Sequence, residues 1–318
     1  MAQDRMQRQR FEFKYLVDEA TALKLRAFIS SHLALDEASV EQPNYSYRVS
    51  SLYLDSAELY TFWDWVNANR NRFKLRLRFY DACPDTPVYL EIKRRVCGCI
   101  LKQRCGLHKS AVSSGLIGQV PPRSSLASSD PKQLVALETV LNLASVLQAR
   151  PKALVTYLRE AYVDPENENV RLTLDRQVRI ALCPEVAFNL SLQPYVQPFG
   201  DRVILELKFN NRFPSWFSDM VQQFGLTRGA AAKYCEGIAA LLYPEHANSL
   251  THPVDSPIVG ANPGLVLKPT EQSPASTPAG ESPLQAALPT ALAETRWPDR
   301  PHSPCRPESK PPISVYPL

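Results

Sequence analysis

The chain has 318 residues, of which 44% are hydrophobic, so it is long enough to bury a sizeable core in one large domain or two smaller ones. Its 36 lysines and arginines stand against 32 aspartates and glutamates, and the formal net charge is only +4. This weak bias excludes wholesale electrostatic attraction to nucleic acid or to an anionic membrane, so any anion site is expected to be local.

The first residues and the cysteines indicate a reduced compartment. The N-terminal stretch MAQDRMQRQRFEFKY is charged where a secretory signal has its apolar segment. The chain has seven cysteines, an odd number, and Cys97, Cys99 and Cys105 lack the paired spacing of a zinc ribbon. No run approaches the roughly 18 apolar residues of a membrane span. We therefore expect a cytoplasmic protein without a transmembrane segment.

Seven segments alternate between two kinds of residue, and this period predicts strands with two unlike faces. In chain order they span residues 10–16, 50–55, 72–80, 88–94, 153–162, 171–180 and 203–209. Helical patterns occupy residues 18–33, 131–147, 214–224 and 230–242, and a Gly/Pro/Ser-rich loop is expected at about 110–130. The simplest arrangement packs these helices outside the strands.

The composition changes at about residue 244, after which the chain is dense in Pro, Ser, Thr and Ala. Such a segment cannot bury enough apolar area to offset the entropy of ordering it. We expect a folded domain over residues 1–243 and a disordered tail over 244–318. Proline-rich pieces of the tail are of a kind that binds partner proteins, although tails without a function are commoner.

The strand at 72–80 has one continuously cationic face. In NRFKLRLRFY, the residues Arg72, Lys74, Arg76 and Arg78 share one face, and leucine and phenylalanine occupy the other. For one isolated strand, the ordinary interpretation is a solvated charged face over an apolar core.

Five further strands repeat this division, which favours a different interpretation. Their charged or polar faces carry Arg10, Glu12 and Lys14; Tyr89, Glu91 and Lys93; Tyr157 and Arg159; Arg171, Thr173 and Asp175; and Glu206 with Lys208. If the apolar faces turn outward under helices, the charged faces line the inside of a barrel. Cations crowded there would repel one another and lose hydration, so the pattern implies a polyanionic ligand and water in the lumen.

The residue types suit phosphate. Arginine binds phosphate oxygens bidentately and stays charged, and lysine adds a compact charge. The inward carboxylates Glu12, Glu91 and Glu206 are oxygen ligands of the type that Mg²⁺ or Mn²⁺ prefers. The chain has no Walker-type loop, kinase signature or dinucleotide-binding fingerprint, so a nucleotide is expected to be held by its phosphates. Duplex nucleic acid is disfavoured because its major groove alone is about 12 Å wide.

Eight segments in order resemble the VTC domain, the polyphosphate polymerase module of the triphosphate tunnel metalloenzymes, over about residues 8–243. They are RFEFKYLV, SLYLDS, NRFKLRLRFY, YLEIKRR, YLREAY, RLTLDRQVR, VILELKF and AAAKYC. The resemblance implies an α+β fold: a closed, mainly antiparallel eight-stranded β-barrel, with helices outside and one helix plugging an end. It also implies Mn²⁺- or Mg²⁺-dependent transfer of the γ-phosphate of ATP to a growing polyphosphate chain, with release of ADP.

The resemblance also implies roles for individual residues. The catalytic set is Arg76, Arg78, Arg159, Lys93 and Lys233; the phosphate-binding set is Arg10, Lys14, Lys74, Lys102, Tyr157, Arg171 and Lys208; and Glu206 binds the metal with Glu12 as helper. Two places depart from the family pattern. Ala232 replaces a serine that commonly precedes the lysine, and Trp63, Asp64 and Trp65 stand where relatives often carry a basic residue and a glycine.

Other interpretations remain open from the sequence. Asp55 and Asp175 fit hydrogen-bond acceptors at turns or strand ends, Tyr53 fits a packing residue, and Glu12 fits an ion-pair partner of its neighbouring cations. A hydrolase of triphosphate or nucleotide triphosphate would use the same residues as a polymerase. A non-catalytic polyphosphate-binding module would bind without metal. Eukaryotic members of the family are attached to membrane-spanning and sensor domains, which this chain lacks, so we expect it to work alone.

Overall fold

The computed structural model describes residues 10–96, 99–112, 121–166, 169–188, 192, 194–210 and 213–247. Its strands are β1 (Arg10–Val17), β2 (Ala34–Leu35), β3 (Tyr47–Asp55), β4 (Arg72–Phe79), β5 (Val88–Val96), β6 (Cys99–Leu107), β7 (Arg150–Val163), β8 (Val170–Leu182) and β9 (Val203–Asn210). Its helices are α1 (Glu19–Ile29), α2 (Glu37–Val40), α3 (Tyr60–Val66), α5 (Pro131–Val146), α6 (Ser215–Gln223) and α7 (Lys233–Leu242). The tail predicted at 244–318 lies outside the described residues from residue 248 onward.

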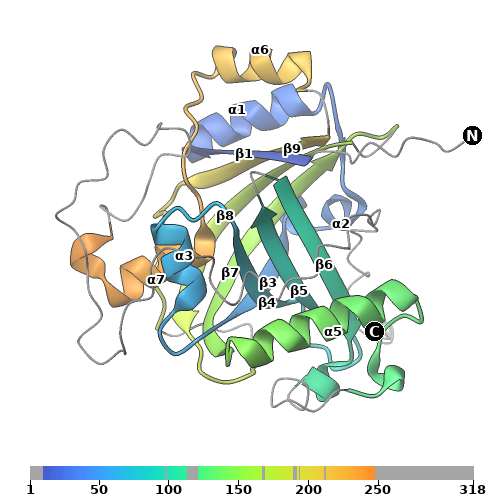
Figure 1. Cartoon of the computed structure of the whole chain (residues 1–318). Helices are drawn as coiled ribbons and strands as arrows, with labels where there is room; N and C mark the ends of the chain where they lie inside the picture. The colour runs from blue at the N-terminus through green and yellow to red at the C-terminus, as the bar shows by residue number, and fades with distance from the viewer. Residues whose placement is uncertain are drawn as a thin grey trace, which may run out of the picture.

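Eight strands form one antiparallel sheet in the order β1-β9-β8-β7-β3-β4-β5-β6, and β2 adds to β7. The sheet curls strongly (Figure 1), so its edge strands β1 and β6 approach to Cα separations within 8 Å. Among the described residues these edges form no ladder, and the sheet is therefore an open half-barrel. The predicted antiparallel eight-stranded sheet with helices outside is confirmed, but the predicted closure is not.

The apolar strand faces point outward and are covered by helices, as the alternation predicts. In β4, Phe73, Leu75, Leu77 and Phe79 join a core cluster with α5. Helices α1 and α6 cover β1, β8 and β9 in a second cluster, and Figure 1 shows these two helices above the sheet and α5 below it. Burial of both layers leaves the charged faces of the strands inside the curl.

Local signals explain where the two longest helices begin. The Asp18 side chain caps α1 by accepting from Thr21 N at 2.6 Å. Asp130 caps α5 by accepting from Lys132 N at 2.9 Å, and Pro131 occupies the first turn. None of the helices in the described ranges is both long and apolar enough to span a membrane.

Helices α3 and α7 lie together at one end of the curled sheet (Figure 1). A buried carboxylate joins them: Asp55 accepts from Thr61 N at 2.9 Å, from Thr61 Oγ1 at 2.8 Å and from Tyr234 Oη at 2.8 Å. Gly237 of α7 packs directly over Ile180 of β8. The start of α7 is thereby fixed against the inner end of the sheet.

A β-bulge interrupts the alternation in β8. The pairing of β7 with β8 shifts between Thr156 and Leu158, and Gln177 on β8 has a φ of +50°. The bulge changes which face the following side chains occupy. Before the bulge the alternation is regular: Asp175 points inward and its neighbour Arg176 donates outward to Glu19 on α1 at 2.9 Å.

Candidate functional site: a cationic cavity inside the curled sheet

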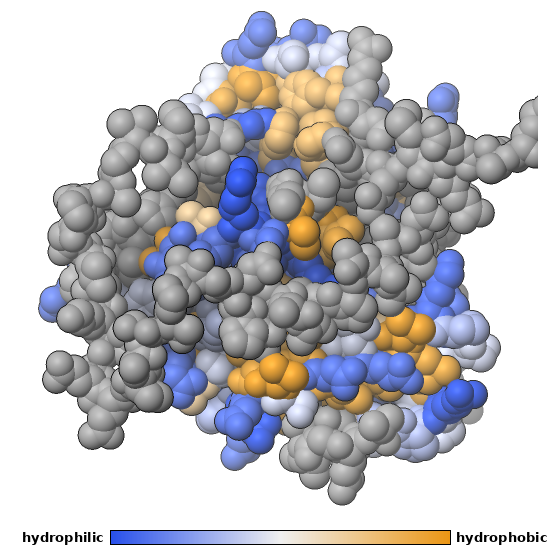
Figure 2. Space-filling view, in the orientation of Figure 1, coloured by the Kyte–Doolittle hydropathy of each residue, from blue (hydrophilic) through white to orange (hydrophobic). Residues whose placement is uncertain are grey.

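The curl of the sheet encloses a cavity of about 330 Å³. Eleven lysine and arginine side chains line it, against two carboxylates. The predicted site residues that it brings together are Glu12, Lys14, Lys74, Arg76, Arg78, Lys93, Tyr157, Arg159, Glu206, Lys208 and Lys233. Figure 2 shows hydrophilic side chains gathered in the hollow between β1 and α5.

Glu12 and Glu206 lie on the adjacent strands β1 and β9, among lysines. Lys93 donates to Glu12 at 2.9 Å, which links β5 to β1 across the open side of the half-barrel. Lys208 lies 3.2 Å and Lys14 3.8 Å from Glu206. Burial opposes ionisation of Glu206, but the charges of Lys208 and Lys14 outweigh it and hold the pKa of this carboxyl well below its usual value.

A third carboxylate, Glu91, anchors Arg76 of β4 and Lys102 of β6. It is fully buried and lies 2.7 Å from Arg76 and 2.6 Å from Lys102. Burial alone would raise the pKa of Glu91, but Lys102 and Arg76 lower it well below its usual value. Glu91 therefore stays ionised and orients the Arg76 guanidinium along the cavity wall.

A fourth carboxylate, Asp175, binds two predicted catalytic cations. Arg159 donates to it through two nitrogens at 2.7 and 2.8 Å, and Lys233 reaches it from α7 at 2.7 Å. Burial would raise its pKa, but Arg159 and Lys233 lower the pKa of Asp175 to about 2. The structure thus corrects the simple turn-acceptor interpretation for Asp175, whereas Asp55 is an acceptor at a strand end as expected.

Arg78 and Lys74 make their hydrogen bonds in the described structure to neutral groups, unlike Arg76 and Arg159. Arg78 is only 8% exposed, and it donates to Ser51 Oγ at 3.3 Å and to Tyr157 Oη at 3.2 Å. Lys74 lies 2.8 Å from Cys235 Sγ. A buried cation without a charged partner destabilises the folded protein, so a bound anion would stabilise this part of the cavity.

Tyr53 was expected to be a packing residue, but its ring also lines the cavity. It stacks on Tyr234 with ring centroids 4.6 Å apart, and Arg76 donates to its hydroxyl at 3.3 Å. Burial would raise the pKa of Tyr53, yet the charges of Arg76, Lys74 and Arg78 lower it to about 8. Only the position of Tyr53 opposite Arg76 across β3 and β4 could have identified it, and that requires the strand register.

Two of the predicted site residues whose side chains the structure describes, Lys102 and Arg171, do not line the cavity. The side chain of Arg10 is outside the described parts of the chain. Lys102 pairs with the buried Glu91 at 2.6 Å. Arg171 lies at the far end of β8, where it pairs with Asp36 at 3.2 Å.

The structure adds lining residues that sequence reasoning did not assign to the site. They are Arg72, Arg94 and Arg95, with Trp65 from α3 and Tyr234 from α7. Arg72 was already on the cationic face of its strand, but the approach of α3 to the end of β4 has no signal in the alternation. The side chain of Ala232 provides no cap for α7, and Glu236 instead accepts from Ala232 N at 2.6 Å.

The donor set fits one kind of divalent metal site. The described residues contain no group of three or more acidic, histidine or cysteine side chains that could hold a metal by themselves. Mg²⁺ is usually held by one or two carboxylates together with waters and substrate phosphates. The adjacent pair Glu12 and Glu206, in a cavity lined for phosphate, meets that requirement.

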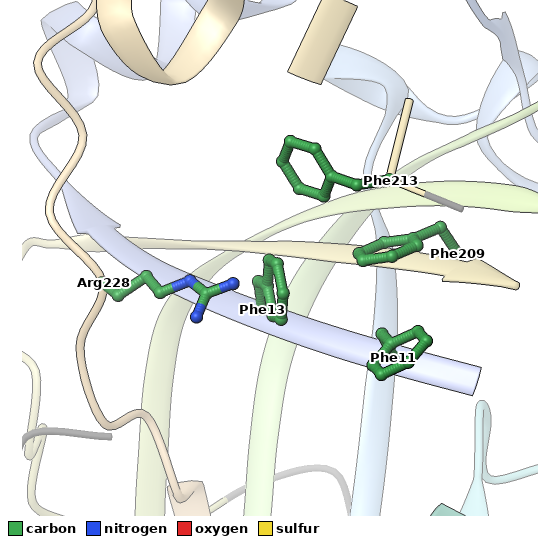
Figure 3. A pocket seen from close by; sticks show the side chains of 5 residues that line it. All are labelled: Phe11, Phe13, Phe209, Phe213 and Arg228. Carbon is green, nitrogen blue, oxygen red and sulfur yellow. The ribbon is translucent and has the colours of Figure 1, made fainter. Parts of the chain in front are cut away.

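A larger cavity of about 430 Å³ lies on the outer side of β1 and β9. Its walls are Phe11, Phe13, Phe209 and Phe213, and Figure 3 shows Arg228 extending toward Phe13. The Arg228 guanidinium carbon is 3.2 Å from the centre of that ring. Four phenyl rings and one arginine offer no set of groups for phosphate chemistry, so the inner cavity is the candidate site.

Solved structures that are similar to this chain include the following two, and no curated protein sequence matches it. The first, described as an adenylate cyclase of Bacillus halodurans, is 14% identical with a TM-score of 0.40, covering 71% of this chain and 95% of its own. The second, a capping-enzyme triphosphatase of Mimivirus, is 11% identical with a TM-score of 0.29, covering 68% and 89%. Comparison with protein families matches residues 9–242 to the VTC domain, which is part of the triphosphate tunnel metalloenzyme superfamily. The chain therefore belongs to the VTC domain family.

Proposed function

We propose that this protein is a metal-dependent polyphosphate polymerase that transfers the γ-phosphate of ATP to a growing polyphosphate chain inside the cationic cavity. The observation that carries the proposal is the charge imbalance of the cavity wall, where eleven cationic side chains face two carboxylates. Arg78 and Lys74, bonded to neutral groups, are the places where phosphate charge is most needed. Membership of the VTC domain family supports polyphosphate as the polyanion.

The chain's own residues can perform most of the work of phosphoryl transfer by holding the phosphates in line. Arg76 and Arg159 are fixed by Glu91 and Asp175, so their guanidinium groups are oriented before the substrate arrives. Lys233, at the start of α7, binds the same Asp175 as Arg159 and adds a third cation. Such preorganised cations stabilise the charge that spreads over the phosphoryl oxygens, and no protein nucleophile is needed.

Glu206, with Glu12, would hold Mn²⁺ or Mg²⁺, which would supply charge neutralisation at the terminal phosphates when bound. The remaining cations act without it. Lys14, Lys93 and Lys208 now pair with these two carboxylates, and they are placed to move onto phosphate oxygens. In this proposal the barrel closes around the chain across its open side, where Lys93 and Glu12 already connect β5 to β1.

A hydrolase of triphosphate or nucleotide triphosphate is the alternative enzyme, because water can replace the phosphate acceptor in the same cavity. We propose that the protein acts in the cytoplasm, where ATP is abundant and where its cysteines would stay reduced. In the described residues, Cys83, Cys105, Cys183 and Cys235 are free thiols.

The test is incubation of the full chain with ATP and Mn²⁺ or Mg²⁺, with polyphosphate followed on a gel beside ADP and free phosphate. Polymer with matching ADP, lost in Glu206→Gln and Arg78→Gln, is the expected result. Glu138→Gln, on the exposed side of α5, is the matched control and should keep full activity. Phosphate release without polymer would replace the polymerase by the hydrolase. Tight polyphosphate binding without any turnover would refute both enzymes.

A further inference from the structure

Three arginines gather at the end of the cavity that lies beside α3. Arg72 is the first residue of β4, and Arg94 and Arg95 lie near the end of β5. Arg72 and Arg95 are direct cross-strand partners. All three line the cavity, together with the Trp65 ring from α3. We call Arg72, Arg94 and Arg95 the arginine mouth.

The arginine mouth has less carboxylate charge near it than the inner cations have: Asp64 on α3 raises the pKa of Arg72, but by less than burial and Arg95 lower it. Within the described residues, none of its three members forms an ion pair with an aspartate or glutamate. Arg72 donates to the carbonyl of Asn69 at 2.6 Å. The Nε and Nη2 atoms of Arg94 are buried and make no hydrogen bond within that part of the chain.

The electrostatics agree with this geometry. Burial lowers the pKa of Arg72, and the charge of Arg95 lowers it further. Burial also lowers the pKa of Arg94. Like charges directly opposite each other on adjacent strands destabilise a sheet. A sequence that keeps three arginines there gains most when an anion neutralises them.

The occupant has to be an anion that reaches the mouth from the inner cavity, because one continuous space joins them. A nucleobase bound there could stack on the Trp65 ring, but it is uncharged and would leave most of the charge of the arginine mouth without a counter-charge. An extended phosphate chain carries charge at every unit, so it can neutralise the inner cations and the mouth together. Guanidinium groups match its oxygens bidentately.

We propose that the arginine mouth is a second binding subsite for inorganic polyphosphate, which holds the part of a long chain that extends beyond the inner cavity. The inference rests on the proposed function and deepens it. A long chain then binds more tightly than tripolyphosphate, because only the long chain contacts both the inner cavity and the mouth. The same contact keeps a growing chain attached between successive transfers.

Titration calorimetry of the full chain without metal tests this, with tripolyphosphate, long-chain polyphosphate and ATP as three separate ligands. The variant is Arg72→Gln combined with Arg95→Gln, and Arg202→Gln, an exposed arginine away from the cavity, is the matched control. The double variant should bind long chains about tenfold more weakly and tripolyphosphate within about twofold of the parent, as expected for loss of two charged contacts in partial solvent. Replacement of both arginines by lysine, which keeps the charge, should restore most of the long-chain affinity.

Equal loss of affinity for long chains and tripolyphosphate would overturn the inference, because the mouth would then act through the inner cavity. Unchanged long-chain affinity would also overturn it. A loss confined to ATP would assign the mouth to the nucleotide instead. If the parent protein binds none of the three ligands, the proposed function itself fails, and this result is distinct from failure of the mouth alone.

Discussion

Replacing Glu91 by glutamine should lower the stability of the free protein and strengthen its response to phosphate. Glu91 is fully buried and pairs with Arg76 at 2.7 Å and Lys102 at 2.6 Å. Removing one partner of a buried ion pair lowers the free energy of unfolding by about 3–5 kcal/mol. The amide oxygen of the introduced glutamine keeps some hydrogen bonding, so we expect a loss of about 3 kcal/mol. For a domain of this size, this loss lowers Tm by about 6–12 °C.

Thermal unfolding with and without tripolyphosphate, in the absence of metal, measures both effects. The anion should raise the Tm of Glu91→Gln by more than it raises that of the parent, because Arg76, which lines the cavity, then loses the carboxylate that holds it, and phosphate can take that place. The difference should correspond to about 1–2 kcal/mol, the size of one charged hydrogen bond. Glu138→Gln serves as the exposed control. Equal anion-induced shifts in the variant and the parent would refute the view that Arg76 faces the ligand.

Three further changes test separate parts of the site. Burial lowers the pKa of Lys208 to about 8, so its ammonium loses its charge as pH rises through that value. Tripolyphosphate affinity, measured between about pH 7 and pH 9, should therefore fall more in the parent than in Lys208→Arg, which stays charged. Parallel curves of affinity against pH would contradict a role for Lys208 in binding. Tyr234→Phe removes a hydrogen bond to the Asp55 carboxylate and should cost about 1.5–3 kcal/mol in denaturant unfolding, so an unchanged midpoint would exclude this contact as an anchor of α7. Gly237→Ala would place a Cβ 2.6 Å from the Ile180 side chain of β8 and should lower the free energy of unfolding by about 1–3 kcal/mol. Gly229→Ala, which has open space, should leave it nearly unchanged. Equal denaturation midpoints for the two variants would mean that α7 does not pack as described.

The alternation of residue types predicted most of the sheet because each strand has one face under helices and one inside the curl. Lys74, Arg76 and Arg78 point into the cavity as the period of two requires. The strand β6 was missed because its sequence, CILKQRCGL, lacks a clean division between apolar and polar faces. Its pairing with β5 places Lys102 directly opposite Lys93, which agrees with the expected position of this lysine on the cationic side.

The details of the site depended on long-range geometry that no local pattern contains. The ion pair of Asp175 with Lys233 joins β8 to α7 across 58 positions of sequence, and the contact of Lys93 with Glu12 spans 81. The β-bulge at Gln177 shifts the phase of β8, so a continuous period of two misplaces the side chains after it. The arginine mouth likewise arises only where α3 meets the ends of β4 and β5.

The most direct test of the central claim is a crystal structure of the full chain grown with tripolyphosphate and Mn²⁺, with the metal located by its anomalous scattering. The account predicts phosphates in contact with Arg76, Arg78 and Arg159, and manganese bound by Glu206 together with phosphate oxygens. Phosphate found only on the outer surface, or manganese bound away from Glu12 and Glu206, would contradict it.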